Sequence, residues 1–167
     1  ADNARLYPMA GAASRAAARS FAVLDGRITA IGASGQARQR LDAEDRVVLP
    51  GFIDCHTHAV YVGDRMHERE QRRAGASYAD IAKAGGGILS SVRGVRAASI
   101  ESLCAATRPR LLALAREGVT TVEIKSGYGL DLESEIRMLE VIAQLRRELP
   151  IDLSATCLAA HAVPPET

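Results

Sequence analysis

The 167-residue sequence has no tryptophan, only two phenylalanines and, among its 21 basic residues, only two lysines, Lys83 and Lys125. It also lacks a hydrophobic run long enough to cross a membrane, because Arg, Asp or Gly interrupts each apolar stretch. Twenty acidic residues balance the basic ones, which argues against a nucleic-acid partner held by bulk positive charge. The sequence therefore predicts a globular protein with a core of its own that binds neither membranes nor nucleic acids.

Cysteine is also scarce. Cys55, Cys104 and Cys157 are odd in number, far apart and without a CxxC pair, so they do not form a disulfide framework. The first twenty residues lack the charged start and unbroken apolar region of a signal peptide. We therefore expect a cytoplasmic protein in which all three thiols are reduced and act as small core residues.

The first part of the chain, residues 1–48, predicts a small β-layer. Two β-prone runs in residues 21–32 flank Asp25-Gly26, a pair typical of tight two-residue hairpin turns. Residues 3–9 predict a neighbouring strand, which Pro8 marks as an edge strand.

After Pro50, strands alternate with helices, which predicts parallel strands joined by right-handed crossovers. Three strands are expected, over 49–58, 118–126 and 151–161. Ser77 and Asp80 form a capping-box pattern for a short helix that ends at the glycines 85–87. The glycine-rich stretch "AGGGILSS" lacks the phosphate-loop pattern and is interpreted as a flexible connection near the site.

Two longer helices are expected between the strands. One begins after Ser99 and ends before residue 118, with an internal Pro109 that should kink it. The other is capped by Asp131 and stopped by Pro150. Its apolar stripe is expected to include Ile136, Leu139, Ala143 and either Leu145 or Arg146.

The stretch "LPGFIDCHTH", residues 49–58, contains two of the four histidines of the chain. Side chains alternate along a strand, so His56 and His58 share a face, about 7 Å apart at roughly 3.3 Å per residue. This spacing lets both imidazoles bind one metal ion. The alternative is a hairpin rim that carries two solvated histidines. A third histidine, His67, lies in a charged helical stretch and is expected to be solvated.

Polar residues also end the other two strands. Lys125 and Ser126 end the second and His161 ends the third, and active-site groups gather at the carboxyl ends of parallel strands. Two alternatives remain open: polar residues commonly mark strand ends, and Glu123 and Lys125 share a face and could form an internal ion pair.

Longer motifs resemble a known family. "LPGFIDCHTH" after a DGRI-type hairpin resembles the start of the metal-dependent amidohydrolase superfamily. "AGASYADIAKAGGGILSSVRGVRAAS", "GVTTVEIKSGYGLDLESEIRML" and "AAHAVPPE" resemble the imidazolonepropionase family. The resemblance implies an α/β fold in two parts: residues 1–48 as part of a small β-sandwich, and residues 49–167 as the first three units of a (β/α)8 TIM-type barrel. Both are incomplete in this chain.

By this resemblance, His56 and His58 match metal ligands, with zinc or iron as the cofactor. The histidines alone suit zinc, iron and nickel alike. Residues that match substrate-binding positions are Arg65, Tyr78, Tyr128 and His161, and His161 also matches a catalytic position. The alternative for Arg65 is a surface ion pair with Asp64 or Glu68.

The family's reaction is the metal-dependent hydrolysis of 4-imidazolone-5-propanoate, which opens the imidazolone ring to give N-formimidoyl-L-glutamate in histidine degradation. The resemblance also implies a homodimer of the full-length enzyme. It places a third metal histidine, a metal aspartate and an acidic proton shuttle on later strands, beyond Thr167, so this chain is expected to be inactive alone. Two other hypotheses remain: a hydrolase or deaminase of another cyclic amide, and a non-catalytic truncation product.

Overall fold

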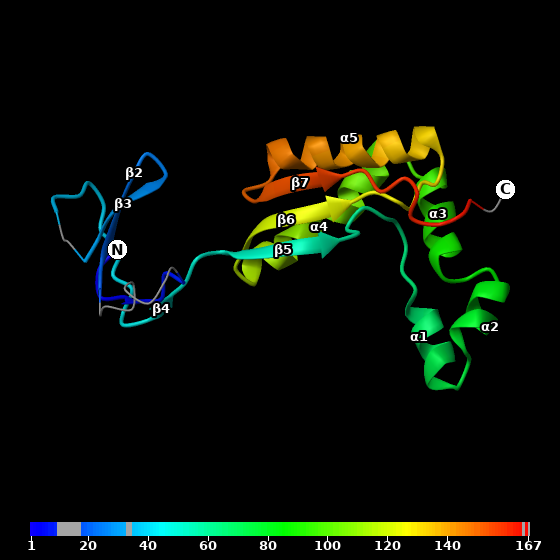
Figure 1. Ribbon diagram of the computed structural model, residues 1–167, viewed down its shortest axis with the longest axis horizontal. Helices are drawn as coiled ribbons and strands as arrows, with labels where there is room; N and C mark the ends of the chain where they lie inside the picture. Colours follow the sequence, from blue (N-terminus) through cyan, green and yellow to red (C-terminus); the bar gives the residue numbers. More distant parts are fainter. Residues whose placement is uncertain (10–17, 33–34, 165, 167) are drawn as a thin grey trace. The chain divides into compact units, whose positions relative to one another are not determined.

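The computed structural model describes residues 1–9, 18–32, 35–164 and 166. The chain divides into two compact units, Ala1–Gly51 and Phe52–Thr167. Figure 1 shows the helices and strands of each unit. None of the helices in these described ranges combines the length and hydropathy that a membrane span requires.

The first unit contains the predicted hairpin. Strands β2 (Phe21–Leu24) and β3 (Arg27–Ile31) pair antiparallel, and Asp25 and Gly26 form the turn with φ of 50° and 74°. The strand expected over residues 3–9 is much shorter. Only β1 (Arg5–Leu6) is extended and paired, and its partner is β4 (Val47–Val48), in parallel, and not the hairpin.

The second unit is built on three parallel strands in the order β5 (Phe52–Thr57), β6 (Val119–Lys125) and β7 (Asp152–Thr156). This confirms the parallel pairing that the alternation of elements predicts. Helix α4 (Ile100–Arg116) leads into β6, and α5 (Leu132–Glu148) leads into β7. The two helices pack against each other and against these strands (Figure 1).

The core of this unit lies between the sheet and the two helices. Val122 and Ile124 of β6 are fully buried there, together with side chains of α4 and α5. The apolar stripe expected on α5 is right for Leu139, which packs against the core, and for Leu145, and it is wrong for its other two members. Ile136 and Ala143 are exposed, whereas the buried apolar side chains are those of Met138, Val141, Ile142 and Leu145. These four follow the i, i+3, i+4, i+7 spacing of one helix face.

Three helices lie between β5 and α4 in the sequence: α1 (Met66–Arg73), α2 (Tyr78–Lys83) and α3 (Ile88–Ala97). The capping box of α2 is confirmed, because the Ser77 side chain accepts from the Asp80 amide and the Asp80 carboxylate accepts from the Ser77 amide. The interpretation of "AGGGILSS" as a flexible connection is wrong for its second half, because α3 begins at Ile88.

The prediction that the cysteines are core residues holds for Cys104 only. Cys104 is buried in α4, but Cys55 and Cys157 are exposed. Cys55 lies on β5, an edge strand of the three-stranded sheet with no strand on its outer side among the described residues. Cys157 follows the end of β7, outside the helix–sheet core.

Candidate functional site: a ring cluster and an adjacent pocket

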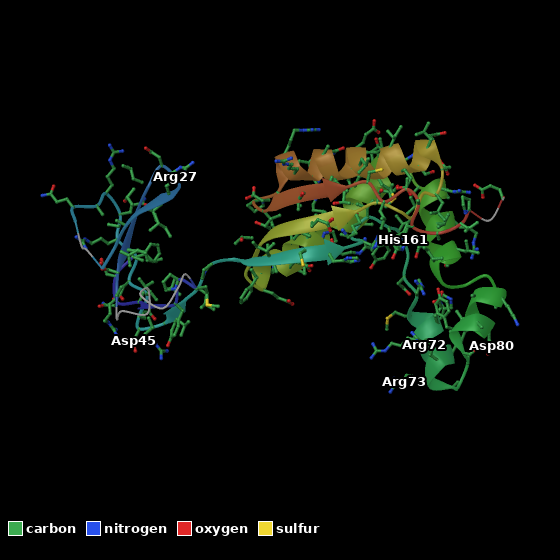
Figure 2. The ribbon with its side chains drawn as sticks, viewed as in Figure 1. Arg27, Asp45, Arg72, Arg73, Asp80 and His161 are labelled. Atoms are coloured by element: carbon green, nitrogen blue, oxygen red, sulfur yellow. The ribbon has the colours of Figure 1, made fainter. Side chains whose placement is uncertain are left out.

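Four predicted site residues meet beyond the carboxyl ends of the three parallel strands. His56 lies near the end of β5, His58 follows that strand, Tyr128 follows β6 and His161 follows β7. The His58 ring lies 5.5 Å from His56, 4.9 Å from Tyr128 and 4.7 Å from His161, centroid to centroid. Figure 2 shows His161 past the strand ends. We call His56, His58, Tyr128 and His161 the ring cluster.

Strand register and one glycine bring these rings together. Lys125 pairs with Thr156, and beyond them the Ser126 amide donates to the Thr156 carbonyl at 3.0 Å. Gly127 has φ of 106°, and a β-carbon built on it would lie 2.7 Å from the His161 β-carbon. Real β-carbons essentially never approach so closely. Glycine at 127 is therefore what allows the loop after β6 to meet the turn that contains His161.

His161 lies further from its strand than the sequence predicts. Strand β7 ends at Thr156, and His161 lies in a turn where its amide donates to the Leu158 carbonyl at 3.0 Å. The Leu158 amide in turn donates to the Ser126 hydroxyl at 2.9 Å. The loops after β6 and β7 are thus bonded to each other, and this contact places His161 beside His58.

The electrostatics of His58 favour a neutral imidazole. Burial lowers its pKa and electrostatic interaction with His161 and His56 lowers it further, whereas a hydrogen bond with the Ser126 backbone opposes these effects. Its Nδ1 atom is buried and has no hydrogen-bond partner within the described ranges. An unprotonated ring nitrogen in this state can accept a proton or bind a metal ion.

The two predicted metal ligands fit part of a metal site. Neutral imidazoles are common ligands of zinc and iron, and His56 and His58 are neighbours. However, the described part of the chain contains no group of three or more His, Cys, Asp or Glu residues placed to hold a metal ion. A catalytic zinc site needs about three protein ligands. The pair therefore suits a site that other residues complete.

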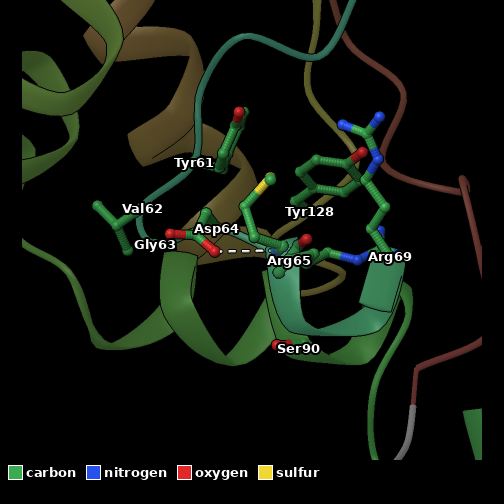
Figure 3. Close-up of a pocket in the computed structure, with 10 residues that line it drawn as sticks. Tyr61, Val62, Gly63, Asp64, Arg65, Arg69, Ser90 and Tyr128 are labelled. Carbon is green, nitrogen blue, oxygen red and sulfur yellow. Dashed lines mark hydrogen bonds between the residues drawn. The ribbon is translucent and has the colours of Figure 1, made fainter. Parts of the chain in front are cut away.

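A pocket of about 420 Å³ lies next to the ring cluster (Figure 3). Two predicted substrate-binding residues, Arg65 and Tyr128, line it, and Tyr128 also belongs to the ring cluster. Burial raises the pKa of the Tyr128 phenol, and the charge of Arg65 opposes this effect. The phenol is therefore a neutral hydrogen-bond donor near pH 7.

Arg65 lines the pocket and also forms the ion pair with Glu68 that was given as its alternative, so its contact with substrate stays a prediction. Its Nε donates to Oε2 of Glu68 at 2.8 Å, and its Nη2 lies 2.8 Å from the same oxygen. Glu68 is only 4% exposed, and its Oε1 accepts from the Gly87 amide at 2.8 Å. Burial alone would raise the pKa of this carboxyl, but the hydrogen bonds from Arg65 and Gly87 hold it below its usual range.

Tyr78 does not join this group. It begins α2, is exposed, and does not line the pocket. Its hydroxyl lies 3.5 Å from the position that a β-carbon on Gly87 would occupy, near the turn that Glu68 holds. Its predicted contact with substrate stays a prediction.

The polar residues of β6 are partners of one another. Lys125 forms an ion pair with Glu123 at 2.5 Å, which confirms the internal pair foreseen as an alternative to a role at the site. The hydroxyl of Thr156 on β7 donates to the same carboxylate. His67 is exposed on α1, as predicted.

The pocket residues that sequence reasoning missed include Tyr61 and Arg69. Tyr61 lies three residues after His58, and Arg110 of α4 stacks on its ring at 3.5 Å while donating to the Tyr61 carbonyl at 2.8 Å. Arg69 follows Arg65 by one helical turn on α1, so its i+4 spacing was a signal that both arginines share a face.

The comparisons with known proteins agree with the motifs. No family model matches the chain. A curated imidazolonepropionase from Hahella chejuensis is 61% identical over 75% of this chain and 31% of its own length. One from Mesorhizobium japonicum is 50% identical over 98% of this chain and 42% of its own length, and one from Pseudomonas entomophila is 62% identical over 71% and 30%. The chain thus spans about a third of the length of these relatives and fits their N-terminal part.

Proposed function

We propose, from this similarity to imidazolonepropionases, that the chain is the N-terminal part of a hydrolase that opens a cyclic amide. The substrate would be 4-imidazolone-5-propanoate and the product N-formimidoyl-L-glutamate, a step of histidine degradation. Identity of 50–62% over most of the chain carries the proposal. The pocket beside the ring cluster, lined by both Arg65 and Tyr128, supports it.

The proposed fold follows from the same premise. The three parallel strands with α4 and α5 would be the first units of a (β/α)8 barrel, and the strand pairs of residues 1–48 part of a small β-sandwich. A complete barrel of this kind needs about 250 residues. We propose a cytoplasmic enzyme that forms a homodimer at full length and binds neither nucleic acids nor membranes.

His56 and His58 would hold one zinc or iron ion together with ligands from the rest of the full-length protein. Such an ion supplies Lewis acidity, which lowers the pKa of water and polarises a carbonyl. The unpartnered Nδ1 of His58 supports this assignment, since a buried nitrogen without a partner is costly unless something binds it.

The other residues bind and orient the substrate. The Arg65 guanidinium has donors beyond those used by Glu68, so it can bind the propionate carboxylate while Glu68 fixes its direction. Tyr128 donates its hydroxyl proton to an acceptor of the imidazolone ring, and His161 gives or takes a proton there as charge develops. Tyr78 would contact substrate only if α2 moved toward the pocket.

The test is hydrolysis by the full-length protein that contains this chain. We expect turnover of 4-imidazolone-5-propanoate, and much slower turnover of cyclic amides that lack a carboxylate tail. Preference for a tail-less amide would favour another amidohydrolase or a deaminase. If no tested amide is hydrolysed, the result would favour the alternative that the chain belongs to a non-catalytic truncation product.

Metal content gives a second readout that does not depend on turnover. We expect the full-length protein to retain about one metal ion per chain and His58→Ala to lose it, as measured by elemental analysis after dialysis. His67→Ala is the matched control, because His67 is exposed on α1. Equal metal retention by His58→Ala and the unchanged protein would remove His58 from the metal site.

A further inference from the structure

The loop that carries Tyr128 is folded around a buried carboxylate. Glu135, in the first turns of α5, is only 3% exposed. Its Oε2 accepts from the Gly127 amide at 2.8 Å, and its Oε1 accepts from the amides of Gly129 and Leu130 at 2.7 and 2.9 Å. Three of the four amides of residues 127–130 therefore point at one side chain.

The backbone of this loop needs such a partner. Gly127 and Leu130 both have positive φ, 106° and 57°, so the chain curls back on itself and turns its amides inward. Amides buried in a loop have no ladder partner, and a buried amide without a partner destabilises the fold. A carboxylate can accept several hydrogen bonds at once, and bonds to a charged acceptor are about twice as strong as neutral ones.

Gly129 is held from its other side as well. Arg96 of α3 donates from Nε to the Gly129 carbonyl at 2.7 Å and pairs with Asp131, the N-cap of α5, at 2.8 Å. A β-carbon on Gly129 would lie 2.7 Å from the Glu135 amide nitrogen, so the loop lies directly against the start of α5. The residues on both sides of Tyr128, Gly127 and Gly129, are thus hydrogen-bonded to α5, and Gly129 also to α3.

This fixation decides where the Tyr128 ring lies. Its ring stacks on His58 at 4.9 Å with an interplanar angle of 22°, and its side chain lines the pocket next to Arg65. Glu135 neither belongs to the ring cluster nor lines the pocket. Any effect of Glu135 on substrate must therefore pass through the loop.

We propose that Glu135 is a positioning residue that sets the Tyr128 ring against His58 and the pocket. The inference rests on the proposed function, in which Tyr128 contacts the substrate. Glu135 itself touches no reacting atom. Its role is to keep one loop conformation in which the phenol already points at the bound ring, so that binding does not have to order the loop.

The test is Glu135→Gln in the full-length protein. Glutamine has nearly the same shape but offers one oxygen and one NH2 group, so at least one of the three amides faces a donor in place of an acceptor. We expect KM for 4-imidazolone-5-propanoate to rise about tenfold, with a smaller change in kcat. Glu133→Gln is the matched control, since Glu133 lies in the same turn but its side chain is 87% exposed.

A double-mutant cycle separates positioning from mere stability. In a Tyr128→Ala background, Glu135→Gln should change KM by less than about twofold, because the ring that it positions is gone. A full tenfold change in that background, or a lower Tm with unchanged KM in the single variant, would overturn the proposal. Should Glu135→Gln not fold, Glu135→Asp carries the same test, since its shorter side chain cannot reach all three amides.

Hydrogen exchange keeps this inference distinct from the proposed function. In Glu135→Gln, the amides of Gly127, Gly129 and Leu130 should exchange about tenfold faster relative to those of β6. Unchanged exchange would refute the loop arrangement whatever the substrate. A second outcome is faster amide exchange in Glu135→Gln together with no hydrolysis of the imidazolone by the protein without the substitution. That result would support the loop arrangement but refute the proposed function, and with it the role assigned to the Tyr128 ring.

Discussion

Glu68→Gln is the substitution that most directly tests how the pocket is held. In the structure the Glu68 carboxylate accepts from Arg65 with one oxygen and from the Gly87 amide with the other. The variant keeps the size of the side chain and removes its charge. One amide oxygen can still accept from Gly87, but the NH2 group then faces the Arg65 guanidinium, donor against donor.

The magnitude follows from burial. A hydrogen bond to a charged group contributes about 1.5–3 kcal/mol, and Glu68 is 4% exposed, so little water can replace the lost acceptor. Arg65 is 38% exposed at its side chain and regains part of its hydration, which favours the lower end of that range. We expect the free energy of unfolding to fall by about 2 kcal/mol, measured by urea denaturation of the full-length protein.

The stability difference between the unchanged protein and Glu68→Gln should depend on pH in one direction. The pKa of Glu68 is held below its usual range in the folded state, so its ion pair stabilises the protein above the pKa of the unfolded chain, about 4.3. This contribution is lost as the pH falls through the lower, folded pKa. The stability difference between the unchanged protein and Glu68→Gln should therefore be full near pH 7 and shrink below about pH 4. A difference under about 0.5 kcal/mol at pH 7, or one that grows on acidification, would refute the reasoning.

Three further substitutions test the site and the core. Arg65→Lys keeps the charge but loses the planar two-pronged contact, so kcat/KM for 4-imidazolone-5-propanoate should fall about tenfold to a hundredfold in steady-state kinetics, and an unchanged value would remove Arg65 from the site. Gly127→Ala should lower the free energy of unfolding more than Gly75→Ala does. Both glycines have positive φ, but of the two only a β-carbon on residue 127 would lie 2.7 Å from another side chain, that of His161. Equal losses in the two variants would contradict this close approach. Leu145→Ala should cost about 2–5 kcal/mol in urea denaturation, because Leu145 is fully buried, and a loss below about 1 kcal/mol would place it outside the core.

The sequence predicted the three strands and the helices α2, α4 and α5 of the second unit because the signals for these elements are local, but it did not predict α3. A capping box at Ser77, an N-cap at Asp131 and β-branched residues in 118–126 each act within a few residues, and the structure has an element at each. The buried face of α5 was predicted only in part, for a different reason. Ile136 is apolar and helically spaced with Leu139, but which stripe faces the sheet depends on tertiary packing.

The members of the ring cluster and the pairing of His56 with His58 were predictable, but the route by which His161 reaches His58 was not. His56 and His58 follow from strand alternation, whereas His161 lies in a turn beyond β7, and its approach to His58 depends on Gly127. Glycine in "SGYG" signalled a tight loop, but nothing local indicated which segment that loop would touch. Long-range contacts of this kind require the packed structure.

The burial of Glu68 and Glu135 was not predicted from the sequence. Glu68 and Glu135 both lie in short charged stretches, "HERE" and "LESE", which would normally mark solvated helix faces. Glu68 accepts from one loop amide, that of Gly87, and from Arg65, whereas Glu135 accepts from three loop amides, those of Gly127, Gly129 and Leu130. The loops need a charged acceptor because they have no ladder partner, and the carboxylates need several donors to leave water. Each contact between a buried glutamate and a loop therefore forms only when the helix and the loop pack together. The pattern to search for in related chains is a glycine-containing loop after a strand or helix, together with a glutamate one or two turns into an adjacent helix.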